Sequence, residues 1–73
     1  MAMTASATMV DQIGEVAGVI WHLLDETGPL PLTQVVKEVD APRDVIMQGI
    51  GWLAREEKLV IEEEGRRKIA TLV

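Results

Sequence analysis

Hydrophobic residues recur with a helical period through residues 9–27. On a helical wheel of about 100° per residue, the apolar side chains between Val10 and Leu24 cover an arc of roughly 200°. Acidic residues and His22 take the opposite side. A surface helix needs an apolar stripe little wider than about 100°, so this helix is predicted to bury two sides. Thr27-Gly28-Pro29 should end it, because glycine accepts the left-handed conformation and proline cannot continue a helix.

A segment bracketed by prolines, Leu30-Pro31-Leu32, follows this helix. It is too short for a helix and is predicted to form a brief edge strand, where a missing N–H is tolerated. Thr33 is the expected N-cap of a short second helix over residues 34–39. The next break, Asp40-Ala41-Pro42, offers a capping carboxylate and a proline suited to a first helical turn.

The third helix is predicted over residues 42–57. Gly49 lies inside it, at a cost of about 1 kcal/mol relative to alanine. That cost is understandable if another helix packs closely against Gly49. Trp52 is predicted to anchor the core, so that its truncation to alanine would cost about 3–5 kcal/mol. The wheel places the following residues on the buried side: Val45, Ile46, Gly49, Ile50, Trp52 and Leu53.

The period changes after residue 58. Residues 59–63 and 67–72 are rich in β-branched side chains and flank the glycine-bearing turn Glu64-Gly65-Arg66, which predicts a β-hairpin. The first strand ends in acids and the second begins with bases. Glu62 and Glu63 are therefore expected to pair across the ladder with Arg67 and Arg66.

The order of elements is helix, short strand, helix, tight turn, helix, hairpin. A turn of few residues between the second and third helices is typical of a helix-turn-helix unit. A hairpin after the third helix is the wing of a winged helix. The predicted fold is therefore α+β and mostly α, a winged helix-turn-helix domain with a short third strand beside the wing. It should occupy residues 9–73, and the small polar residues 1–8 should form a disordered tail.

The sequence also resembles a known family. The stretch from Gly49 to Leu59, which contains Gly-Trp-Leu-Ala-Arg-Glu and follows Val45-Ile46-Met47-Gln48, is similar to the signature of a family of short, little-characterised prokaryotic winged helix-turn-helix proteins. The resemblance extends over about Val10 to Leu72. It implies the winged-helix fold and a homodimer, and it supplies no ligand or catalytic residue.

Small size makes assembly a question in its own right. A chain of 73 residues without cysteine has a thin core and no disulfides to support it. Oligomerisation is the remaining route to stability, and the excess apolar arc of the first helix favours a homodimer. The alternative is that three helices and a sheet simply surround that arc. The expected interface residues are Val16, Val19, Trp21 and Leu23.

Nucleic-acid binding is the first function to consider, because the third helix of such folds reads DNA bases. Arg43, Gln48 and Arg55 lie on its predicted outward side and have side chains suited to guanine and adenine. The net charge of −5 and the pI near 4.6 argue against phosphate binding. The charges of the third-helix region cancel, and so do those of the hairpin, where three glutamates face Arg66, Arg67 and Lys68. Pairing with these glutamates is the simpler explanation of the three wing cations, but they lie at a wing tip and are also candidate DNA contacts.

A protein-binding adaptor is the alternative function. Met47, Gly51 and Ala54 give the outward side of the third helix a small, smooth patch better suited to protein than to phosphate. A DNA-binding, regulator-like homodimer and an adaptor on the same fold therefore both stay open. The fold-level argument for DNA is an analogy and not evidence from a site.

Catalysis is not expected. The chain has no nucleophile–base pair, no glycine-rich phosphate loop and no metal-ligand spacing, so no catalytic residue, metal or cofactor is predicted. No apolar run is long enough to span a bilayer. Residues 1–8 lack the basic start of a secretory signal. The expected location is the cytoplasm.

Overall fold

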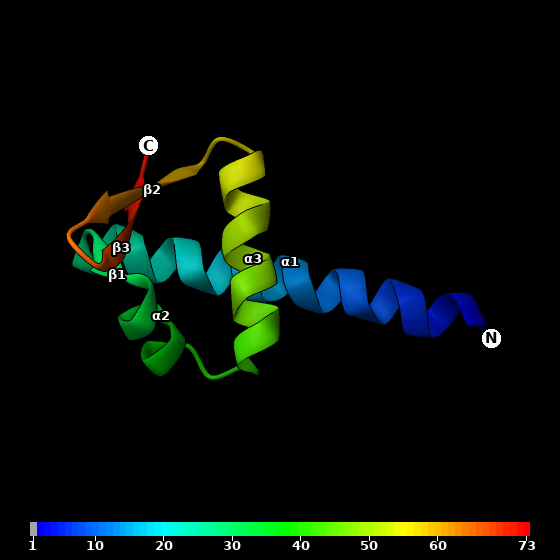
Figure 1. The fold of residues 1–73 in the computed structure, drawn as a ribbon. Helices are drawn as coiled ribbons and strands as arrows, with labels where there is room; N and C mark the ends of the chain where they lie inside the picture. The colour runs from blue at the N-terminus through cyan, green and yellow to red at the C-terminus, as the bar shows by residue number, and fades with distance from the viewer. Residues whose placement is uncertain (1) are drawn as a thin grey trace.

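The computed structural model describes the backbone of residues 2–73 and the side chains of residues 9–73. It confirms the predicted α+β, mostly helical winged helix-turn-helix architecture (Figure 1). The predicted disordered tail, residues 1–8, lies outside the part whose side chains are described, so this boundary stays a prediction. The elements are α1 (Ala2–Thr27), β1 (Leu30–Pro31), α2 (Leu32–Glu38), α3 (Arg43–Arg55), β2 (Leu59–Glu64) and β3 (Arg67–Leu72).

The sheet is antiparallel, with strand order β1-β3-β2. Strands β2 and β3 form the wing, and Gly65, at φ 65°, takes the left-handed conformation that their two-residue turn requires. Because β2 extends to Glu64, the loop is shorter than predicted. The observed partners are Glu64 with Arg67 and Glu63 with Lys68. The predicted pairing of Glu62 and Glu63 with Arg67 and Arg66 is therefore wrong.

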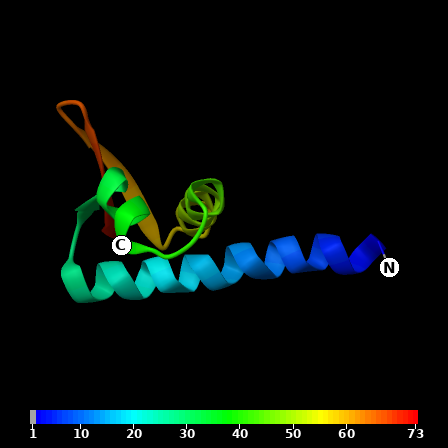
Figure 2. The ribbon, with the colours of Figure 1, turned by 90° about the horizontal axis from the view of Figure 1, so that it is seen from below.

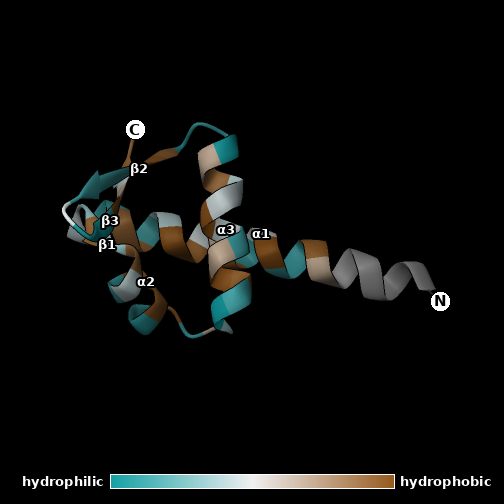
Figure 3. Ribbon diagram, viewed as in Figure 1, coloured by the Kyte–Doolittle hydropathy of each residue, from teal (hydrophilic) through white to brown (hydrophobic). Residues whose placement is uncertain are grey.

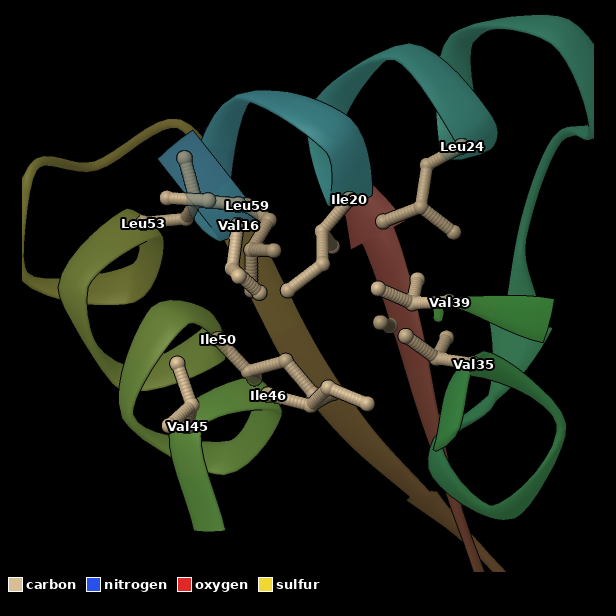
Figure 4. Close-up of a cluster of buried hydrophobic side chains, with 12 residues drawn as sticks. Val16, Ile20, Leu24, Val35, Val39, Val45, Ile46, Ile50, Leu53 and Leu59 are labelled. Atoms are coloured by element: carbon tan, nitrogen blue, oxygen red, sulfur yellow. The ribbon is translucent and has the colours of Figure 1, made fainter. Parts of the chain in front are cut away.

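The core lies between the three helices and the root of the sheet (Figure 4). Ile20 points from α1 into the middle of this cluster and is 0% exposed. Every side chain of the core is aliphatic. The buried residues are Val16, Ala17, Ile20, Leu24, Val35, Val39, Val45, Ile46, Ile50, Leu53, Leu59 and Ala70.

Helix α3 crosses α1 at Gly49, as the sequence predicted (Figure 1). A Cβ atom on Gly49 would lie 3.2 Å from Cδ1 of Ile20 and 3.3 Å from the backbone nitrogen of Ala17. Glycine thus lets the two helices approach more closely than any other residue would allow. This contact positions α3 on the rest of the domain.

Trp52 was predicted to anchor the core, but the structure places it outside the core. Its side chain is 50% exposed and lies beside α1, near Gly14 and Ile13. The wheel placed Trp52 on the buried side of α3. The aliphatic residues fill the core without it, and the indole lies over the open hollows beside α1. The prediction of its burial is therefore wrong.

The Trp52→Ala variant should lose only about 1–2 kcal/mol of unfolding free energy, because half of the side chain already contacts water. Trp21 remains as a fluorescent reporter of unfolding. Urea denaturation at sub-micromolar protein concentration measures the loss. A loss above about 3 kcal/mol, typical of a fully buried tryptophan, would contradict the observed position.

The helix ends differ from the sequence expectations in their caps. The N-cap of α2 is Pro31 and not Thr33, and the N-cap of α3 is Pro42 and not Asp40; neither makes a side-chain capping bond. Helix α3 ends at Arg55, and Glu57 takes a left-handed φ of 61°. The N–H groups of Glu57 and Lys58 then donate to the carbonyls of Ala54 and Leu53, a Schellman motif.

Candidate nucleic-acid interface

An open groove of about 620 Å³ lies between α2, α3 and the wing. Figure 2 shows the hairpin rising beside α2 and α3, on the side of these helices away from α1. The apolar stems of Leu32, Val36 and Met47 contribute to the wall, and Met47 is 38% exposed. The groove is lined by Pro31, Leu32, Thr33, Val36, Lys37, Arg43, Met47, Arg66, Arg67 and Lys68.

Positive charge is concentrated in this groove. The chain has seven basic residues, and five of them line the groove: Lys37, Arg43, Arg66, Arg67 and Lys68. None of the lining residues is acidic. The five cations come from three elements, α2, the start of α3 and the wing, which only the fold brings together. An acidic chain thus has a local basic surface, the feature expected of a phosphate-binding site.

Five carboxylates lie on the elements around the groove: Glu38, Asp44, Glu62, Glu63 and Glu64. Glu63 and Glu64 are the strand partners of Lys68 and Arg67 and temper the charge of the wing, whose far half is hydrophilic (Figure 3). Glu62 pairs with Ile69, further from the turn of the wing. The two carboxylates on α2 and α3 are engaged within their own helices. Glu38 accepts a 2.7 Å hydrogen bond from the Gln34 side chain, and Asp44 accepts one of 2.9 Å from the N–H of Val45.

The structure brings together most of the predicted nucleic-acid residues. Arg43 lies in the groove with the three wing cations. Gln48 and Arg55 are exposed on α3 but do not line the groove. Gln48 lies four residues before Trp52 and Arg55 lies three residues after it, so both share the flank of α3 that carries Trp52. Arg43 and Met47 lie on the flank that faces the wing.

Lys37 and Thr33 also line the groove, although the sequence pattern did not mark them as nucleic-acid candidates. They lie four residues apart, so they share one face of α2. This spacing was readable from the sequence. The sequence could not show that the shared face points toward the wing, because the wing is some thirty residues further along the chain.

The predicted dimer residues divide into three kinds. Val16 belongs to the intramolecular core and is 8% exposed, so it has little surface to offer a second chain. Trp21 and Leu23 are partly buried and pack against that core, and the Trp21 ring also contacts His22 edge to face at 5.3 Å. Val19 is 51% exposed.

Two further findings concern the described part of the chain. No three His, Asp or Glu side chains in it gather closely enough to hold a metal ion. None of its helices combines the length and the apolar character needed to cross a membrane.

The element order, the helix-turn-helix formed by α2 and α3, and the three-stranded sheet that carries the wing define a winged helix-turn-helix protein. The chain belongs to the family described as "Winged helix-turn-helix domain (DUF2582)", which it matches over residues 6–72. The resemblance inferred from the sequence is thus confirmed at the level of the family.

Relatives occur in archaea and bacteria. The chain is 36% identical over 67 residues to "Uncharacterized protein MJ1608" of Methanocaldococcus jannaschii, covering 88% of this chain and 94% of the relative. Among solved structures, protein BT2368 from Bacteroides thetaiotaomicron has a TM-score of 0.76 at 29% identity and covers 85% of this chain and 76% of that chain. AF1382 from Archaeoglobus fulgidus shares the fold, with a TM-score of 0.63 at 19% identity and coverage of 86% and 69%.

Proposed function

We propose that this protein is a homodimeric, cytoplasmic, regulator-like module that binds duplex DNA through the groove between α2, α3 and the wing. The observation that carries the proposal is the placement of five of the seven basic residues in one groove that no acidic side chain lines. Charge summed over each element argues against DNA. The charge of the groove itself favours DNA binding, because a ligand responds to the electrostatic potential of the surface that it contacts.

The groove residues suit different parts of a duplex. Lys37 and the wing cations are long and exposed, which suits contacts to the phosphate backbone. Arg43 and Met47 lie one helical turn apart on α3, where an arginine can reach guanine and an apolar side chain can contact a thymine methyl group. No aromatic residue lines the groove, so it lacks the stacking platform typical of single-strand binding.

Titration of fluorescent duplex at two salt concentrations tests the proposal. Each phosphate contact makes the slope of log K against log salt more negative by about 0.9. The loss of one such contact therefore lowers the association constant by roughly eightfold at 0.1 M salt. Arg43→Gln removes a base contact worth about 1–3 kcal/mol, so it should weaken binding at least about fivefold. The triple variant Arg66→Gln, Arg67→Gln, Lys68→Gln should weaken it by more than about thirtyfold and flatten the salt slope by about two units or more.

Arg55→Gln is the matched control, since it removes the same charge from the same helix but outside the groove. Its affinity should stay within about twofold of the unsubstituted chain. Equal losses for Arg43→Gln and Arg55→Gln would show that net charge, and not the groove, governs binding. Failure to bind any duplex at low salt, where the electrostatic attraction is strongest, would exclude the proposal.

An adaptor that grips an acidic segment of another protein is the second candidate. The exposed Met47 and the apolar walls of the groove favour it, because such surfaces suit protein side chains. Recovery of one stoichiometric protein partner, lost on Arg43→Gln, together with no duplex affinity, would favour this function over the first.

A further inference from the structure

A second surface lies on the opposite flank of α3. Beyond the crossing at Gly49, the N-terminal part of α1 continues past α3, and no other element of the described chain covers it (Figure 2). The half-exposed Trp52 stands over this corner. We call it the Trp52 surface; it consists of two adjoining hollows lined by Val10, Asp11, Ile13, Gly14, Glu15, Ala17, Gly18, Trp21, His22, Trp52, Leu53 and Lys58.

The Trp52 surface is apolar and open. Trp52 is 50% exposed, and Val10 and Met9, which continue the apolar stripe of α1, are 58% and 50% exposed. The same stripe is buried further along, from Val16 to Leu24, where α3 and the sheet cover it. The stripe is therefore longer than the domain that covers it, which is typical of a helix that packs against a second partner.

Two glycines leave room for a close partner. A Cβ atom added at Gly14 or Gly18 would meet nothing within 4 Å, so neither residue serves a contact inside the monomer, unlike Gly49. They lie four residues apart and therefore share one face of α1. Glycines at this spacing allow the backbone of another helix to come close.

The charges at the two ends of the surface are opposite. Asp11 and Glu15 line the hollow toward the N-terminus of α1, and no basic residue lines it. Lys58 lines the other hollow, with His22 and without an acidic residue. A second copy of the same surface, turned by a twofold axis, would place the acidic end of one protomer against the lysine of its partner.

We propose that the Trp52 surface is the homodimer interface and that its occupant is a second copy of this chain. The two α1 helices cross in antiparallel orientation near Gly14, and Trp52 of each protomer covers Val10 of its partner. A twofold interface must be complementary to itself. The opposite charged ends, the open glycines and the exposed tryptophan meet this requirement within one patch. This interface does not include Val16, which is buried in the monomer. Dimerisation through the Trp52 surface does not depend on DNA binding.

Sedimentation equilibrium of the full chain, without DNA, tests the proposal with the variant Gly14→Gln. Glutamine favours helix more than glycine does, and its Cβ atom would meet nothing within 4 Å inside the monomer. The monomer should therefore keep or gain resistance to urea, whereas the dimer dissociation constant should rise at least tenfold. Loss of dimerisation without loss of folding separates an interface from a structural role.

Gly51→Gln is the control, because Gly51 is also an exposed helical glycine with open space around a Cβ but lies on α3 outside the surface. Its dissociation constant should match that of the unsubstituted chain. A strictly monomeric unsubstituted chain at high micromolar concentration would overturn the proposal. A dimer that Gly14→Gln leaves unchanged would also overturn it.

Discussion

The Ile20→Ala variant should lose about 3–4 kcal/mol of unfolding free energy, the largest effect expected for a single truncation in this chain. Ile20 is 0% exposed and points from α1 into the centre of the core. Its Cδ1 atom also packs at the closest approach of α1 and α3. Truncation removes buried methyl groups and leaves a cavity that the crossed helices cannot close without separating.

That loss is large relative to the whole stability of such a domain. At roughly 0.05–0.15 kcal/mol per residue, a chain of this length has about 4–11 kcal/mol in total. Each kcal/mol corresponds to about 4–8 °C in Tm for a domain of this size. Urea denaturation followed by circular dichroism, at low protein concentration, measures the change.

Val19→Ala is the control for Ile20→Ala, since the neighbouring residue on the same helix is 51% exposed. Its unfolding free energy should stay within about 0.5 kcal/mol of the unsubstituted chain. Similar losses for the two variants would contradict the orientation of α1 and therefore the assignment of its core side.

The Gly49→Leu variant should lose about 2–3 kcal/mol, because a side chain at this position would force α1 and α3 apart. Even a Cβ atom would lie 3.3 Å from the backbone nitrogen of Ala17, which cannot move without the whole of α1. The gain in helix propensity, at most about 1 kcal/mol, is too small to offset this strain. Thermal unfolding should show the loss as a lower Tm.

Gly51→Leu is the matched comparison two residues further along α3. Nothing lies within 4 Å of a Cβ atom there, so the leucine meets no obstacle and gains helix propensity. Its stability should rise by up to about 1 kcal/mol. A loss of stability for Gly49→Leu together with a gain for Gly51→Leu would support the helix crossing at Gly49. A gain of stability for both variants would refute it.

The run from Gly49 to Arg55 illustrates the reach of sequence reasoning. Its apolar spacing predicted that Gly49 would meet another helix and that Ile50 and Leu53 would be buried, and the structure confirms each. The same wheel placed Trp52 inside, and this was wrong. A wheel gives the direction of a side chain, but the shape of the facing helix decides whether a large ring fits there.

The candidate groove shows a similar division. The sequence selected Arg43 and the three wing cations as nucleic-acid candidates, and the structure places these four residues in one groove. It gave no reason to expect that Lys37 would join them or that Gln48 and Arg55 would lie elsewhere. The charges of the third-helix region and of the hairpin each sum to zero along the chain. In the folded protein, five basic residues and no acidic residue line the groove.

The sequence by itself determined the order of the elements, the turn at Gly65, the tight helix contact at Gly49 and most of the aliphatic core. These features follow from local periodicity and from the conformations that single residues allow, so they need no knowledge of distant segments. Only the tertiary structure decided the strand register, the exposure of Trp52 and the gathering of five cations in one groove. Each of these depends on which surfaces meet when α2, α3 and the wing pack together, and that depends on contacts between residues far apart in the chain.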